Sequence, residues 1–159
     1  PDPARRLIYG HSLGGAVAID LAAKLAADGT ACRPQARGLI VEATFTSLPD
    51  VAAELSWSWL PTSLILTQRF DSISKIRTID VPVLVVHGAG DRFIPAKFSQ
   101  ALYGAAPEPK RLLLVENGSH NNSMWTGNGD YQRALAELFG KPGDAVRVHA
   151  DGAPFWRRC

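Results

Sequence analysis

Short apolar runs alternate along the chain with longer segments of helical periodicity. The apolar runs lie at residues 6–11, 38–43, 81–87 and 111–115, and the periodic segments lie at residues 13–25, 95–106 and 130–139. Because the runs are continuously apolar, and do not alternate with polar residues, they are typical of strands buried on both faces. Strands that alternate with helices predict an α/β fold with a parallel sheet and flanking helices.

The predicted helices carry recognisable start and stop signals. The first has Leu13, Val17, Leu21 and Leu25 along one face at i,i+4 spacing, with alanines filling the positions between. The second begins with a proline in its first turn, and the third ends at a glycine followed closely by a proline. The apolar segment 49–72 is interrupted by a proline, so one or two short helices are expected there.

Composition excludes several classes of protein. With 46% hydrophobic and 20% charged residues, the chain is an ordinary globular sequence and not an intrinsically disordered one. Its 17 basic and 15 acidic residues give a net charge of +2, which is too balanced for a nucleic-acid or anionic-membrane partner. No apolar run reaches the roughly 18 residues that a membrane span needs. No metal-ligand spacing is present, so neither a metal nor an organic cofactor is expected.

The ends and the cysteines of the chain lead to two further expectations. Cys32 and Cys159 do not form a disulfide framework, which favours a reducing compartment and predicts a cytoplasmic location. The first residues carry no signal-peptide pattern and no methionine. The chain is therefore expected to be a fragment of a longer product, and an anchor or signal upstream stays open.

The pentapeptide Gly10-His11-Ser12-Leu13-Gly14 lies between a predicted strand and a predicted helix. This is the setting of a nucleophile elbow, in which a serine is held in a strained conformation on a very tight turn. Side chains at Gly10 and Gly14 are expected to collide with the neighbouring strand and helix. The alternative, a plain glycine-rich turn, is disfavoured by the flanking elements. Ser12 then lies near a helix N-terminus, which favours developing negative charge.

A serine hydroxyl needs a base, and the chain has four histidines. His120 follows the fourth predicted strand after a short turn, a favourable place for chemistry in a parallel sheet. His11 is interpreted as structural, pointing away from the serine hydroxyl. His87 ends the third strand, and His149 lies in the tail. His120 is therefore the candidate base, although an exposed loop histidine would be the ordinary interpretation by itself.

An acid that orients the base is found after the third strand. Asp91 follows the strand end and is the candidate acid, with a helix N-cap as its alternative role. Glu42 also lies at a strand end and is kept as a less favoured acid. Asp71 and Asp80 are further rivals.

The order Ser12, Asp91, His120 is the nucleophile, acid, base order of the α/β-hydrolases. The chain resembles the C-terminal part of an α/β-hydrolase over roughly residues 5–140, most closely the serine-aminopeptidase-like and monoacylglycerol-lipase-like subset. The resemblance rests on the elbow, on residues 83–88 with Asp91 and Pro95, on residues 118–121, and on residues 42–47. It implies an acyl-enzyme mechanism on a Ser-His-Asp triad, with the backbone N–H of Leu13 in the oxyanion hole.

The resemblance also implies what the chain lacks. The family fold has about eight strands, of which this chain supplies the last four, together with only one of two oxyanion-hole donors. Losing one donor typically costs about 10²–10³ in rate. As a partial domain (1–140, with 141–159 an irregular tail), the chain is expected to be poorly stable, to self-associate through its exposed sheet edge, and to be weakly active.

Residues 49–72 occupy the place of a short lid-like insert in this fold. Within and beyond it, one set of side chains is predicted to line an acyl pocket: Trp57, Trp59, Leu60, Leu64 and Trp125. Ordinary packing of these side chains on the sheet is an equally weighted alternative for the insert.

The sequence therefore predicts a serine hydrolase acting on carboxylic esters, with a small-molecule acyl substrate. Peptidase, thioesterase and acyltransferase activities remain alternatives, because the same triad serves each of them. A non-catalytic truncated remnant is the alternative from a different class.

Overall fold

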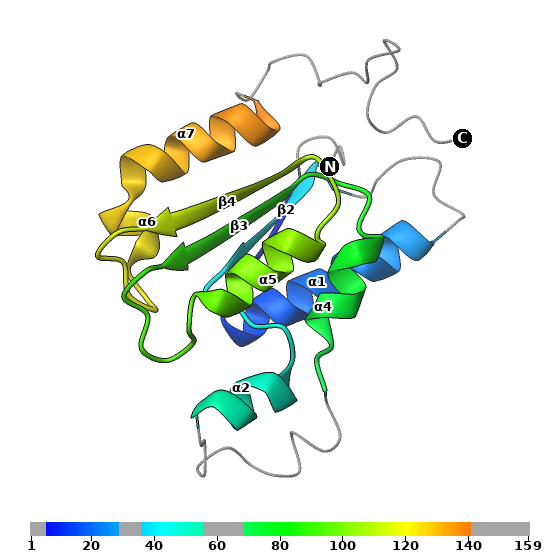
Figure 1. Cartoon of the computed structure of the whole chain (residues 1–159). Helices are drawn as coiled ribbons and strands as arrows, with labels where there is room; N and C mark the ends of the chain where they lie inside the picture. The colour runs from blue at the N-terminus through cyan, green and yellow to red at the C-terminus, as the bar shows by residue number, and fades with distance from the viewer. Residues whose placement is uncertain (1–5, 29–35, 56–68, 141–159) are drawn as a thin grey trace.

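Four parallel strands form one sheet in the order β1-β2-β3-β4 (Figure 1). The computed structural model describes residues 6–28, 36–55 and 69–140. The strands are β1 (Leu7–His11), β2 (Gly38–Glu42), β3 (Val83–Gly88) and β4 (Lys110–Val115). Each falls on an apolar run of the sequence, and the prediction of a parallel sheet with flanking helices is confirmed.

Helices cover both faces of this sheet. α7 lies on one face, and α1, α4 and α5 lie on the other (Figure 1). The helical segments are α1 (Leu13–Ala27), α2 (Leu48–Leu55), α4 (Ser72–Lys75), the 3₁₀ turn η2 (Ile76–Thr78), α5 (Lys97–Ala105), α6 (Ser123–Thr126) and α7 (Asn128–Phe139). Pattern predicted α1, α5 and α7. It did not predict α6 or the α4–η2 pair as separate elements, because elements of three or four residues are too short to show a period.

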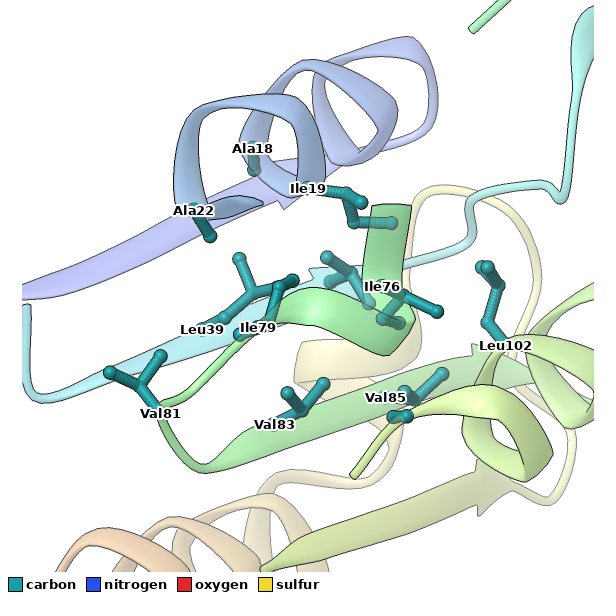
Figure 2. Close-up of a cluster of buried hydrophobic side chains, with 12 residues drawn as sticks. Ala18, Ile19, Ala22, Leu39, Ile76, Ile79, Val81, Val83, Val85 and Leu102 are labelled. Atoms are coloured by element: carbon teal, nitrogen blue, oxygen red, sulfur yellow. The ribbon is translucent and has the colours of Figure 1, made fainter. Parts of the chain in front are cut away.

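The two central strands form the middle of the core. Every residue of β2 and β3 is buried, as their continuous apolar runs predicted. Figure 2 shows the larger apolar cluster, where Leu39, Val83 and Val85 of the sheet pack beneath Ile19 of α1 and Ile76 of η2. A second cluster lies on the other face, under α7. The C-terminal ends of all four strands therefore share one edge of a well-anchored sheet.

The buried face of α1 differs from what spacing suggested. Leu13, Val17 and Leu21 lie on the outside, with 42%, 52% and 47% of their surface exposed. The buried face consists of small residues and one isoleucine: Gly15, Ala16, Ala18, Ile19 and Ala22. A small-residue face lets the helix approach the sheet closely, and this leaves the larger apolar side chains pointing outward.

Several expectations lie outside the described residues. They concern Trp57, Trp59, Leu60 and Leu64 as pocket residues, Cys32 and Cys159, and the tail 141–159. In the described part of the lid-like segment 49–72, α2 lies at its start and α4 begins at its end. None of the helices that the structure describes is long and apolar enough to cross a membrane.

Candidate active site

Ser12 is the single residue between the end of β1 and the start of α1. Its backbone has φ 54° and ψ −123°, a conformation that non-glycine residues rarely adopt and that costs about 1–3 kcal/mol. Three hydrogen bonds hold it there. Its N–H donates to the carbonyl oxygen of Glu42 at 2.8 Å. Its own carbonyl accepts from the N–H of Gly15 at 3.0 Å and from the Thr44 hydroxyl at 2.8 Å. The turn is therefore strained and firmly fixed, as an elbow requires.

The glycines around Ser12 do not contribute equally to this turn. A Cβ on Gly10 would overlap the Gly14 carbonyl group and lie 2.7 Å from Ala18 Cβ, so the predicted collision is correct at that position. A Cβ on Gly14 would meet nothing within 4 Å, so the collision predicted there is wrong. The tight contact on the helix side belongs to Gly15, where a Cβ would lie 2.6 Å from Thr44 Cβ. The helix α1 thus approaches β1 closely at Gly10 and approaches Thr44, after β2, closely at Gly15.

This difference predicts opposite effects for two alanine substitutions. Gly10→Ala is expected to destabilise the fold by about 1–3 kcal/mol, because backbone and a neighbouring Cβ must move to admit the methyl group. Gly14→Ala should be neutral or stabilising by up to about 1 kcal/mol, since alanine favours a helix and the site is open. Urea unfolding of both variants measures the difference. Equal destabilisation by the two would contradict the packing described for α1.

His120 lies on the loop after β4 and reaches both Ser12 and Asp91. Its Nε2 is 3.0 Å from Ser12 Oγ, and its Nδ1 is 2.7 Å from Asp91 Oδ2. Because a carboxylate only accepts, Nδ1 carries the hydrogen and Nε2 is the acceptor for the serine hydroxyl. A bond from the Gly90 N–H to the Gly118 carbonyl ties the two loops together at 2.8 Å. The three predicted residues are thus brought together in one line of hydrogen bonds.

Asp91 does not cap a helix, which was its alternative role, because α5 (Lys97–Ala105) has Ala96 at its N-cap; its carboxylate instead serves a turn and His120. Its Oδ1 accepts from the backbone N–H groups of Phe93 and Ile94, at 2.8 and 3.0 Å, and so closes a turn before α5. Its Oδ2 is left for His120. The two roles coexist because each uses a different oxygen of the carboxylate.

The charge of Asp91 is held in a buried position. Its side chain has no exposed surface, and burial by itself raises the pKa of a carboxyl group. Hydrogen bonds from His120, from His87 and from the two backbone N–H groups outweigh that effect, and the pKa of Asp91 lies well below its usual range. Asp91 is therefore a carboxylate throughout the neutral pH range.

His11 is a partner of the His120 loop. Its Nε2 donates to the backbone carbonyl of His120 at 2.7 Å, and the two imidazole centroids are 4.9 Å apart. The interpretation of His11 as structural agrees with this contact, which links the elbow directly to the loop that carries His120. The position of His11 within the motif from Gly10 to Gly14 did not predict this hydrogen bond to the carbonyl of His120.

Glu42, the rival acid, contacts a different group. Its Oε2 accepts from the Tyr9 hydroxyl at 3.0 Å, and it is 97% buried at the end of β2. Burial, followed by the Glu42 charge and hydrogen bond, raises the pKa of Tyr9 to about 12. Of the other rivals, Asp71 caps α4 and Asp80 is exposed. Asp91 is thus the acid that contacts His120.

A pocket of about 260 Å³ opens beside this line of hydrogen bonds. Its lining comes from the ends of β1 and β2 and from the segment after His120: Tyr9, His11, Glu42, Asn121, Met124 and Trp125. Trp125 was predicted as a pocket residue, and its side chain is 80% exposed at the pocket wall. Tyr9 and Met124 were not predicted. Within the described ranges, no group of three or more metal-ligating side chains comes together.

The chain is similar to one protein family, to several curated proteins and to solved structures. Residues 4–121 match the family described as Serine hydrolase (FSH1). The chain is 40% identical over 121 residues to the protein Rv2307c of Mycobacterium tuberculosis, covering 76% of this chain and 40% of that protein. It is 31% identical over 122 residues to lysophosphatidylserine lipase ABHD12 of Danio rerio, covering 69% of this chain and 31% of that protein.

Among solved structures, the esterase domain of a Rhodothermus marinus protein has a similar fold. The TM-score is 0.62 at 22% identity, with 84% of this chain and 62% of that chain covered. At this level of identity the likeness concerns the fold. The chain spans less than half the length of both curated relatives.

Proposed function

The chain belongs to the Serine hydrolase (FSH1) family, and on this premise we propose that it cleaves carboxylic esters through Ser12, His120 and Asp91. The α/β-hydrolase resemblance is confirmed at the level of the superfamily, by this family and by the fold neighbours. The roles of Ser12, His120 and Asp91 and the choice of carboxylic esters as substrates are what we propose beyond this family assignment. The observation that carries it is the unbroken line Ser12 Oγ, His120 Nε2, His120 Nδ1, Asp91 Oδ2, with distances of 3.0 and 2.7 Å.

The geometry supports a two-step acyl transfer. His120 Nε2 takes the proton of the Ser12 hydroxyl as Oγ bonds to the ester carbonyl carbon, and the carbonyl oxygen becomes an oxyanion. His120 then gives the proton to the leaving alkoxide, the C–O bond breaks, and an acyl-serine remains. Water repeats the sequence with His120 as base, which releases the acid and restores Ser12. Asp91 holds the Nδ1–H tautomer of His120 and stabilises its imidazolium form.

The start of α1 provides one donor for the oxyanion. The first N–H groups of a helix have no partner within the helix, and the helix dipole adds positive potential at that end. The N–H of Leu13, the residue after Ser12, is the donor that the proposal uses. Neutral esters therefore gain stabilisation in the transition state, where their oxygen carries charge.

Two observations favour an ester with an apolar acyl group. The similarity to a lysophosphatidylserine lipase and to an esterase fold supports ester chemistry. Met124 and Trp125 are the apolar part of the pocket beside the site, where an acyl chain can pack, while Tyr9, His11, Glu42 and Asn121 make its polar part. Peptidase, thioesterase and acyltransferase reactions use the same line of residues and stay as alternatives.

A matched set of substrates tests the proposal. p-Nitrophenyl esters from acetate to dodecanoate are compared with the p-nitroanilide and the thioester of the preferred acyl group, on the parent and on Ser12→Ala. The proposal expects ester turnover with the parent, at least tenfold slower anilide cleavage, and none above background with Ser12→Ala. Turnover that survives Ser12→Ala, or an anilide cleaved faster than its ester, would contradict it. A folded but inactive parent would support the non-catalytic remnant.

The outer face of the sheet edge supports a further prediction about association. Leu7 and Tyr9 of β1 expose 42% and 47% of their surface on the α7 side of the sheet, and Val17 and Leu21 of α1, which lies on the other side, expose 52% and 47%. In the described part of the chain β1 pairs only with β2, so its other edge has free backbone groups.

We expect the chain to self-associate through the β1 edge and the exposed apolar side chains on its two sides. Light scattering after size exclusion should give a mass above that of the monomer, and Val17→Lys with Leu21→Lys should lower it. The matched control is a pair of exposed positions on α7 with the same added charge, Gln132→Lys with Ala136→Lys, which should leave the mass unchanged. A monomeric parent would rule this out.

A further inference from the structure

A second histidine contacts the same carboxylate oxygen as His120. His87 lies near the end of β3 and is completely buried. Its Nε2 is 3.3 Å from Asp91 Oδ2 and 2.8 Å from the carbonyl oxygen of Ile94. Its Nδ1 is 2.6 Å from the hydroxyl of Ser99. The ester-cleaving mechanism above uses neither His87 nor Ser99.

The neighbours of His87 determine which of its nitrogens carries the hydrogen. Both neighbours of Nε2 are acceptors, a carboxylate oxygen and a backbone carbonyl, so Nε2 must donate. In the neutral imidazole, Nδ1 is then an acceptor, and Ser99 is a side chain that can donate to it. Ser99 is itself completely buried in the first turn of α5. The two acceptors at Nε2 therefore set the Nε2–H tautomer of His87, and the Ser99 hydroxyl donates to Nδ1 and holds the ring in place.

This arrangement gives the buried carboxylate of Asp91 a donor on every side. Oδ1 accepts from two backbone N–H groups, and Oδ2 accepts from His120 at 2.7 Å. Nε2 of His87 lies on the other side of Oδ2 at 3.3 Å and shares its hydrogen with the Ile94 carbonyl at 2.8 Å. A buried charge is tolerated only when such donors surround it. A line of five side chains results: Ser99, His87, Asp91, His120 and Ser12.

We propose that His87, oriented by Ser99, is a positioning residue for Asp91, whose Oδ2 it holds against Nδ1 of His120. The inference rests on the proposed function, because it gives Asp91 the role of orienting the base. His87 does not touch the substrate. It fixes the carboxylate from within the core, so that the charge of Asp91 stays aimed at the imidazole that must become positive in the transition state.

Two variants of His87 separate this role from simple packing. His87→Leu fills similar space without a donor, and His87→Gln places an amide N–H near the position of Nε2. The Leu variant is expected to lower kcat for the preferred ester about 10–100-fold with KM within about twofold, as loss of an orienting partner typically does. The Gln variant should recover most of that loss. Ser99→Ala should give a smaller loss in kcat, since it leaves the Nε2–H of His87 in place and removes only the hydroxyl that orients the ring.

A control for stability is available on the same strand. Val85 is completely buried but belongs to the apolar cluster on the α1 face. Val85→Ala is expected to lower the thermal midpoint while leaving kcat unchanged. If His87→Leu keeps the parental kcat, or if His87→Gln is as impaired as His87→Leu, the inference is wrong.

A second measurement does not depend on turnover. The imidazole ¹⁵N chemical shifts of the parent and of Ser99→Ala report the tautomer of His87. The inference expects the Nε2–H tautomer in the parent and in Ser99→Ala alike, because the carboxylate of Asp91 and the carbonyl of Ile94 face Nε2 in both. An Nδ1–H tautomer in the parent, which leaves Nε2 without a hydrogen to point at Asp91, would overturn it. A parent with the expected tautomer but no reactive Ser12 would reject the proposed function and leave the His87 geometry intact.

Discussion

Replacing His120 with alanine is expected to lower kcat for ester hydrolysis by about 10⁶-fold, the loss that removal of the base from a serine hydrolase site typically causes. The reason is the 3.0 Å contact between its Nε2 and Ser12 Oγ. Without that acceptor the hydroxyl keeps its proton at neutral pH and is a weak nucleophile. Steady-state kinetics with the preferred p-nitrophenyl ester measures the effect.

A matched control lies on the same loop. Glu116 is exposed on the segment between β4 and His120. Glu116→Ala should keep parental activity, because it removes a side chain from the loop without touching the site. If His120→Ala kept more than about a hundredth of the parental kcat, His120 would not be the base.

Replacing Asp91 with asparagine should lower kcat about 10⁴-fold while leaving the fold intact. The amide can present an N–H toward His120, so Nδ1 becomes the acceptor and the hydrogen moves to Nε2. The imidazole then points a donor at Ser12 Oγ and cannot take its proton. The control is Asp80→Asn, an acid that is exposed before β3. If Asp91→Asn kept the parental activity, Asp91 would not be the acid of the site.

The same substitution changes how stability depends on pH. The pKa of Asp91 is lowered in the folded state, so ionised Asp91 stabilises the fold above the pKa of an unfolded aspartate, near 3.9. That contribution is lost as the pH falls below about 4 toward the folded-state pKa. Urea unfolding should therefore show Asp91→Asn less stable than the parent at pH 7, with the gap closing on acidification. A constant gap between pH 7 and pH 3 would contradict the assigned hydrogen bonds.

Much of the sheet was predictable because each buried strand is one continuous apolar run. Ser12 and His120 are 108 positions apart, yet both could be found, because in a parallel sheet strand ends meet at one edge. The motif from Gly10 to Gly14 also marked the position of Ser12 between a predicted strand and a predicted helix. By contrast, spacing cannot tell which face of a helix meets the sheet, and for this reason Val17 was placed with an apolar face that turned out to be exposed.

Other parts of the site depend on contacts that no local pattern encodes. The space around Gly14 depends on how α1 approaches the sheet through Gly15 and Thr44. The one available signal for His87 was its i,i+4 spacing from Asp91 across a strand end. On a helix, such spacing places two side chains in contact. Here His87 lies at the end of β3 and Asp91 in the loop that follows, and the turn between them brings the two side chains together. The partner of His11 was equally out of reach, because it is a backbone carbonyl on a distant loop.

The activation of Ser12 can be tested directly by intact-mass spectrometry after treatment with a fluorophosphonate. Such a probe reacts with a serine hydroxyl only where a base and an oxyanion donor activate it. We expect one adduct on the parent chain and none on Ser12→Ala, with folding of both checked by circular dichroism. A folded parent that takes up no adduct, or a Ser12→Ala variant that takes up as much as the parent, would contradict the activation of Ser12.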